Sequence, residues 1–198
     1  MYIQEYPWLI TIYKGENRFL VVPNVKHKGN YRLESSWGIN LNCDEQSELA
    51  RGIEASLEYI KQSPISTVTP KEYNPAWKHN TKYKSWASFW KNNIRGGIIY
   101  YEDGQFKVCS NMRAATPRQE YGDCIKIIDL PAGTTLDEVA EAVLDVFEAA
   151  EEYYKTHKAI DRYPQKEITL VDDTKLTLKP PCDRHFEDSE DYGTGEIY

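Results

Sequence analysis

The side chains best suited to acid–base, nucleophilic or metal chemistry are four histidines and four cysteines, and their spacing does not assemble a site. The histidines lie far apart, in polar loops or at helix ends: His27, His79, His157 and His185. The cysteines are widely spaced, without a CxxC pair: Cys43, Cys109, Cys124 and Cys182. P-loop, dinucleotide-binding, serine-hydrolase and zinc-protease patterns are also absent. We therefore expect no catalytic residue, no metal and no cofactor, and a protein that is not an enzyme.

The strongest chemical pattern is electrostatic and spans residues 137–152. Seven carboxylates occupy this stretch, and no Lys or Arg interrupts them. Asp137, Glu141, Asp145 and Glu148 follow one another at helical spacing, which places them along one side of a helix. Such a side is either a solvated face that aids solubility or a preformed docking surface for a basic partner. We favour docking, and predict these four residues as partner contacts.

A charge-led interface also needs an aromatic anchor, because rim charges mainly set the association rate. The candidates are Tyr153 and Tyr154, which follow Glu152 at the end of the acidic stretch, and Tyr192 near the C-terminus. We include Glu152 among the predicted contacts. The acidic residues within 183–196 are expected to add a second contact that orders on binding.

Residues 61–95 have the opposite charge, with seven Lys or Arg against one acidic residue. Aromatic side chains lie among these cations: Tyr83, Trp86, Phe89 and Trp90. Such a segment can bind nucleic acid by phosphate pairing and base stacking, although the whole chain carries a net charge of −7. The alternative function is therefore an RNA-binding module built on residues 71–95, or a nucleotide- or RNA-processing enzyme that uses His27 or His79.

A repeated strand pattern organises the rest of the chain. Residues 9–13 and 19–22 predict one hairpin, and residues 97–101 and 105–109 predict another around an Asp-Gly turn. Each hairpin is followed by a third strand, over 36–42 and 124–130 respectively. Asn24 and Asn111 recur just after the second strand of each unit, where we expect them to form turns.

Each unit ends in an amphipathic helix. The first helix has Asp44 as its predicted N-cap and an apolar stripe of Leu49, Ile53, Leu57 and Ile60. The second helix opens with a capping box of Thr135 and Glu138, and its stripe is Val139, Val143, Phe147 and Ala150. Each stripe must be buried against a sheet. We therefore predict an α+β fold with antiparallel strands and both helices packed on the sheet, in one sheet or two.

Composition and repeats together divide the chain into five segments. They are a first β-β-β-α repeat over 1–64, a basic aromatic connector over 65–95, a second repeat over 96–157, a hairpin over 158–178 and an acidic mobile tail over 179–198. The N-terminus lacks the basic and apolar regions of a signal peptide, and no window approaches the length of apolar chain that spans a bilayer. We expect a cytoplasmic protein with reduced thiols and no membrane partner.

Several of these stretches resemble immunity proteins of bacterial contact-dependent growth inhibition systems (CdiI-like proteins). The resemblance rests on the run 83–86 (YKSW), the strand 124–130, the capped helix beginning LDEV at 136–139, and the stretch 35–39 (SSWGI). It implies a small cytosolic protein that binds the C-terminal toxin domain of its cognate effector, often a nuclease, and blocks it without chemistry of its own. Such proteins are commonly acidic because toxin nucleases are basic. The duplication and the C-terminal extension depart from a single-unit pattern.

Overall fold

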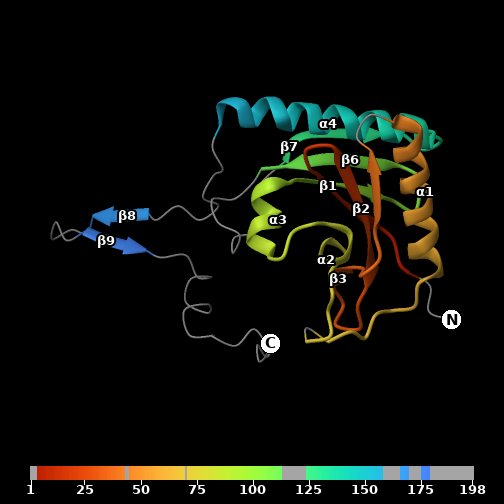
Figure 1. Cartoon of the computed structure of the whole chain (residues 1–198), viewed down its shortest axis with the longest axis horizontal. Coiled ribbons are helices and arrows are strands. Elements are labelled where there is room, and N and C mark those ends of the chain that lie inside the picture. The colour runs from red at the N-terminus through yellow and green to blue at the C-terminus, as the bar shows by residue number, and fades with distance from the viewer. Residues whose placement is uncertain are drawn as a thin grey trace.

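The computed structural model describes residues 4–42, 45–69, 71–112, 124–157, 166–169 and 175–178. Their main element is a seven-stranded antiparallel sheet with the order β3-β2-β1-β5-β6-β7, in which β4 also pairs with β2 (Figure 1). The strands are β1 (Trp8–Lys14), β2 (Arg18–Lys26), β3 (Arg32–Glu34), β4 (Ile39–Asn42), β5 (Ile94–Tyr100), β6 (Phe106–Asn111) and β7 (Cys124–Leu130). The predicted α+β class is confirmed.

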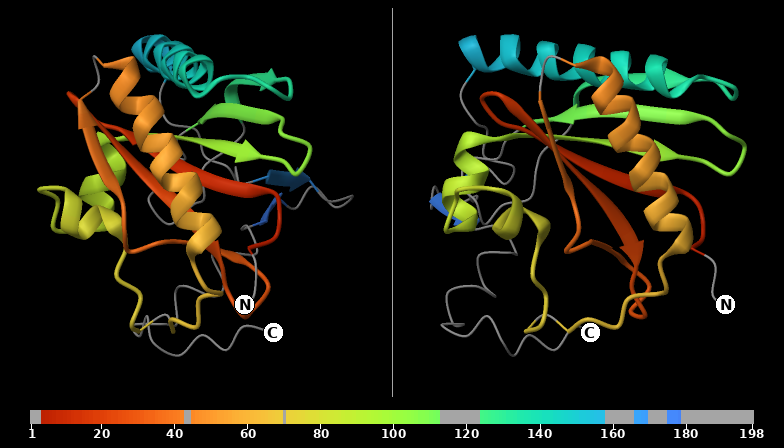
Figure 2. Two further views of the ribbon diagram at one scale, coloured as in Figure 1. Left: turned by 90° about the vertical axis from the view of Figure 1, so that its right-hand side faces the viewer. Right: turned by 45° about the vertical axis from the view of Figure 1, so that its right-hand side comes forward.

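The two long helices cover the same face of the sheet and contact each other (Figure 2). They are α1 (Gln46–Gln62) and α4 (Leu136–Thr156). Their apolar stripes form one core with the strands, in which Phe147 of α4 meets Phe19 of β2 edge to face at 5.4 Å. Ile53 of α1 is fully buried in the same core, and Leu57 is partly buried against it. The predicted packing of both helices on the sheet is confirmed.

Two short helices cover part of the opposite face: α2 (Ala76–Asn80) and α3 (Trp86–Asn92). Ile12 and Val21 belong to the core under α1 and α4, whereas their neighbours Tyr13 and Leu20 pack in a second cluster with Phe89 of α3. Successive side chains of a strand point to opposite faces. The sheet therefore separates the long helices from the short ones.

The two repeated units form one continuous sheet through their first strands. The hairpins β1–β2 and β5–β6 are both present, as the repeat predicts. β1 pairs with β5 along its whole length, with Trp8 opposite Tyr100 and Lys14 opposite Ile94. In the second hairpin, Gly104 has a φ of +86°, the left-handed conformation that the Asp-Gly turn requires.

The second strand of the first unit is longer than predicted and continues through Pro23 to Lys26. Pro23 is tolerated because β2 pairs with β4 up to Val21 and with β3 from Asn24, so the missing N–H falls between two partner strands. The prediction that Asn24 forms a turn is wrong. Its side chain is buried within the sheet, and its Nδ2 donates to Thr11 Oγ1 at 3.0 Å.

The third strand of the first unit, β4, begins at Ile39 rather than at residue 36. The chain bends before it, where the Ser35 hydroxyl donates to the Trp37 carbonyl at 2.5 Å. The Trp37 ring stacks on Tyr59 of α1 at 4.7 Å. In the second unit, Asn111 ends β6 and is not in a turn, and its Nδ2 donates to Cys124 Sγ on β7 at 3.6 Å.

A separate antiparallel pair, β8 (Lys166–Thr169) and β9 (Lys175–Leu178), lies within the segment 158–178. Asp44, Tyr192 and the predicted tail over 179–198 lie outside the described residues. Among the described helices, none combines the length and the apolar run that crossing a bilayer requires.

Candidate partner-binding surface

Helix α4 is fixed at its start by the predicted capping box. The Thr135 hydroxyl accepts from the Glu138 backbone N–H at 3.3 Å, and Glu138 Oε2 accepts from the Thr135 backbone N–H at 2.7 Å. The Thr135 backbone N–H and the Thr135 hydroxyl both donate to the Glu138 carboxylate, which holds the pKa of Glu138 below its usual value. The stripe from Val139 to Ala150 faces the core, which turns the acidic side of the helix outward.

The predicted acidic contacts are all exposed on this outward side. Asp137, Glu141, Asp145, Glu148 and Glu152 each present an exposed side chain. The backbone carbonyl of Asp137 accepts from Gln46 Nε2 at 2.9 Å, which ties the start of α4 to α1. These carboxylates therefore lie on one accessible surface of α4, as their helical spacing in the sequence predicts.

Three cations pair with carboxylates of this surface. Lys126 of β7 reaches Asp145 at 2.6 Å, and Lys14 of β1 reaches Glu151 at 2.7 Å. Lys155 reaches Glu152 at 2.6 Å within the helix. Within the described ranges, the other carboxylates of residues 137–152 form no ion pair; they are Asp137, Glu138, Glu141 and Glu148. The surface keeps a strong negative field.

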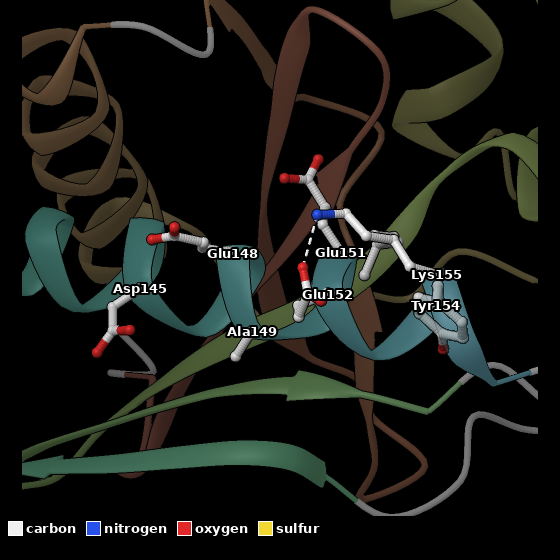
Figure 3. A pocket seen from close by; sticks show the side chains of 8 residues that line it. Asp145, Glu148, Ala149, Glu151, Glu152, Tyr154 and Lys155 are labelled. Carbon is white, nitrogen blue, oxygen red and sulfur yellow. Dashed lines mark hydrogen bonds and ion pairs between the residues drawn. The ribbon is translucent and has the colours of Figure 1, made fainter.

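An open groove with a volume of about 760 Å³ runs along the C-terminal half of α4 (Figure 3). Ile94, Ala149 and Tyr154 give it an apolar part. The charged side chains that line it are Asp145, Glu148, Glu151, Glu152 and Lys155. Such a groove combines apolar contact area with carboxylates, which suits a partner segment that carries both apolar and basic side chains.

The two predicted tyrosine anchors occupy different positions. Tyr154 lines the groove, and its hydroxyl donates to the Asn111 carbonyl at 3.2 Å, which fixes the ring. Tyr153 stacks on His157 at 4.1 Å, and its hydroxyl lies 3.9 Å from Met112 Sδ. Tyr154 is therefore the better placed anchor, while the partner role of both tyrosines stays a prediction.

Two aromatic side chains of the basic segment, Phe89 and Trp90, do not form a stacking platform. Phe89 is fully buried and Trp90 is 6% exposed, so neither ring face is open to a nucleic-acid base. Trp86 and Tyr83 are partly buried against the same cluster. Phe89 instead packs on Trp77 at 5.4 Å. The aromatic pattern reflects a second core on the α2–α3 side, which rules out the alternative of base stacking for Phe89 and Trp90.

The histidines differ in accessibility. His27 is buried, with Nδ1 accepting from the Gly29 N–H at 3.0 Å and Nε2 3.1 Å from the Val68 carbonyl, an arrangement that supports a loop. His79 is exposed and lines a groove of about 510 Å³ together with Glu34 and Glu72. No described hydrogen bond or ion pair joins His79 to either carboxylate.

Some residues of the α4 surface were not found by sequence reasoning. Lys14 and Lys126 come from strands of different units, and Ile94 begins β5. A helix wheel identifies the acidic side of α4 but does not show which strand ends meet it.

Comparison with known proteins gives a fold and no family. No protein-family model and no curated protein sequence matches the chain. Solved structures that are similar to it include the following two. The first, a protein of unknown function (NMB0488) from Neisseria meningitidis, has a TM-score of 0.53 at 14% identity and covers 75% of this chain and 98% of its own. The second, from the CdiA-CT/CdiI toxin and immunity complex of Yersinia pseudotuberculosis, has a TM-score of 0.50 at 9% identity and covers 74% of this chain and 98% of its own.

Proposed function

We propose that this protein is a cytoplasmic immunity protein that binds a toxin domain and neutralises it without chemistry of its own. The observation that carries the proposal is the exposed acidic side of α4 with its groove, on a fold that is also found in a toxin and immunity complex. At 9% identity the likeness shows the fold alone, so the toxin partner is part of the proposal.

The geometry supports a two-part binding mode. Unpaired carboxylates such as Glu141 and Glu148 attract a basic surface at long range, which raises the association rate. The groove beside Ala149 and Tyr154 then accepts an apolar or long basic side chain, which slows dissociation. Inhibition by this route needs only that the covered toxin surface includes its active site or its substrate path. A basic nuclease is the toxin that fits best.

The test starts from the polypeptide encoded immediately upstream of this protein's gene. Its C-terminal domain is produced with and without this protein in a bacterial host, and growth and direct binding are measured. We expect growth arrest by the domain alone, and rescue together with a stable complex when this protein is present. A domain that arrests growth but neither binds this protein nor is neutralised by it would overturn the proposal.

Charge reversal locates the interface. In Glu141→Lys/Glu148→Lys the substitutions leave the core untouched, and we expect association to slow by about tenfold at low salt, with a smaller effect at high salt. Glu54→Lys/Glu102→Lys is the matched control, because it makes the same change of formal charge at exposed positions away from the α4 groove. Equal effects of the two double variants would mean that net charge matters and the α4 surface does not.

The alternative is a nucleotide- or RNA-processing enzyme, and one observation favours it: His79 shares its groove with Glu34 and Glu72. An enzyme of this kind would cleave RNA or a nucleotide and lose that activity in His79→Ala. The inhibitor proposal expects no such activity, and neutralisation that is unchanged in His79→Ala.

A further inference from the structure

A second cavity lies on the α2–α3 side of the sheet, between the β1–β2 hairpin and the segment that joins α2 to α3. Its volume is about 270 Å³, which is near the lower end for small-molecule sites. The hairpin contributes Arg18 and the α2–α3 segment contributes Lys82. Figures 1 and 2 show α2 and α3 away from α4, so this cavity is separate from the acidic groove.

The walls of this cavity are held by internal hydrogen bonds. Asn40 Nδ2 donates to the Asn80 carbonyl at 2.6 Å and ties β4 to α2. The Thr81 hydroxyl donates to the Trp77 carbonyl at 2.7 Å and accepts from the Tyr83 N–H at 3.3 Å. These bonds fix the backbone around the opening. A preformed cavity loses little entropy when a ligand binds.

Its charge favours an anion. Arg18 and Lys82 are both exposed, and neither forms an ion pair within the described part of the chain. No Asp or Glu occurs between residues 73 and 101, which include α2 and α3. Glu16 is the acidic side chain among the described lining residues. A guanidinium and an ammonium at one opening match a phosphate, which accepts hydrogen bonds from both.

The remaining lining adds an aromatic ring and amides. Tyr83 is held edge to face against Phe89 at 5.8 Å, and it also lines the cavity. The side chains of Asn17 and Asn40 line the same space and can bond to the edge of a base. An Asp or Glu side chain of a peptide would pair with the cations but leave most of the volume empty. A phosphate joined to a planar base fills both the cationic part and the aromatic part of the cavity.

We propose that this cavity binds a nucleotide, with the phosphate on Arg18 and Lys82 and the base against Tyr83. Glu16 then accepts from a ribose hydroxyl, away from the phosphate. The binding site stands apart from the proposed toxin interface on α4, and substitutions in it should leave toxin neutralisation unchanged.

The test measures binding of uridine 5′-monophosphate, uridine, inorganic phosphate, a twelve-residue oligouridylate and a glutamate-rich peptide by calorimetry at low salt. We expect Arg18→Ala and Lys82→Ala each to weaken uridine monophosphate binding by about tenfold, the usual effect of losing a charge-assisted bond. Neither substitution should change the weaker binding of uridine. Lys28→Ala is the matched control, because it removes an exposed lysine beyond the other end of β2.

The outcomes separate the sources of the phosphate. Binding of the monophosphate supports a free nucleotide, and binding of the oligouridylate alone, with the same dependence on Arg18 and Lys82, supports a nucleotide unit of an RNA strand. Absence of binding by either probe overturns the proposal. So does binding that the two substitutions leave unchanged, or binding of a glutamate-rich peptide in place of both. Circular dichroism of each variant verifies the fold.

Discussion

Gly96→Ala tests how closely the sheet and α4 pack beneath the acidic groove. Gly96 lies on β5, and a Cβ there would be 2.5 Å from the Cys109 carbonyl oxygen and 2.8 Å from Cζ of Phe147. The carbonyl belongs to the neighbouring strand β6, and Phe147 is 1% exposed, so neither neighbour can move away freely. Overpacking of a core costs about 1–3 kcal/mol. We expect Gly96→Ala to lose about 3 kcal/mol of unfolding free energy.

The companion variant Gly52→Ala separates this clash from the mere loss of a glycine. A Cβ at Gly52 would be 2.5 Å from Cδ1 of Leu41, the end of a partly exposed side chain on β4. Moving that methyl group costs about 0.5–1.5 kcal/mol, while Ala in a helix interior gains about 1 kcal/mol over Gly. We expect a net change within about 1 kcal/mol. Urea unfolding followed by tryptophan fluorescence measures both variants. A loss in Gly96→Ala no greater than that in Gly52→Ala would refute the packing argument.

Three further predictions concern single side chains. Thr135→Ala removes the N-cap of α4 and should cost about 1 kcal/mol in urea unfolding. Burial, and then the charge of Glu34, raise the pKa of Tyr73 above its ordinary value of 10.0. The stability that comes from the protonated Tyr73 hydroxyl is complete below pH 10 and is lost as the pH rises further. Tyr73→Phe should therefore reduce the fall of the urea unfolding midpoint at alkaline pH. Burial, with Cys124 nearby, raises the pKa of Cys109 to about 12, and alkylation mapped by mass spectrometry at pH 8 should be at least about a hundredfold slower than in the unfolded chain.

The second unit could be predicted almost completely because its signals are local. The Asp-Gly turn, the capping box and the 3.6-residue stripe each act within a few residues, and each has the predicted structure. The first unit was harder to predict from the sequence. Pro23 suggests the end of a strand, and only the gap between β3 and β4, set by distant pairing, explains why β2 continues past it.

The candidate surface on α4 also has one part that local sequence patterns predict and another part that they do not. The exposed row from Asp137 to Glu148 follows from helical spacing alone. The groove depends on Ile94 of β5 and Tyr154 of α4 lining the same space, although 60 positions separate them in the sequence, and no local pattern encodes that arrangement. The aromatic residues of the basic connector allowed two interpretations for a related reason. Aromatic side chains interspersed with lysines indicate either stacking platforms or a small core, and burial of Phe89 decides for the core.

The arrangement of charge fits the two proposed ligands to opposite faces of the sheet. The unpaired carboxylates of α4 lie on one face, and Lys82 with the other cations of the α2–α3 segment lies on the other. A net charge of −7 alone would attract a basic protein to any side. Separation by the sheet instead makes the α2–α3 face repel a basic toxin and the α4 face repel a nucleotide. The sheet thereby places the acidic and the basic stretches of the chain on opposite surfaces. Each surface can repel the ligand that is proposed for the other surface.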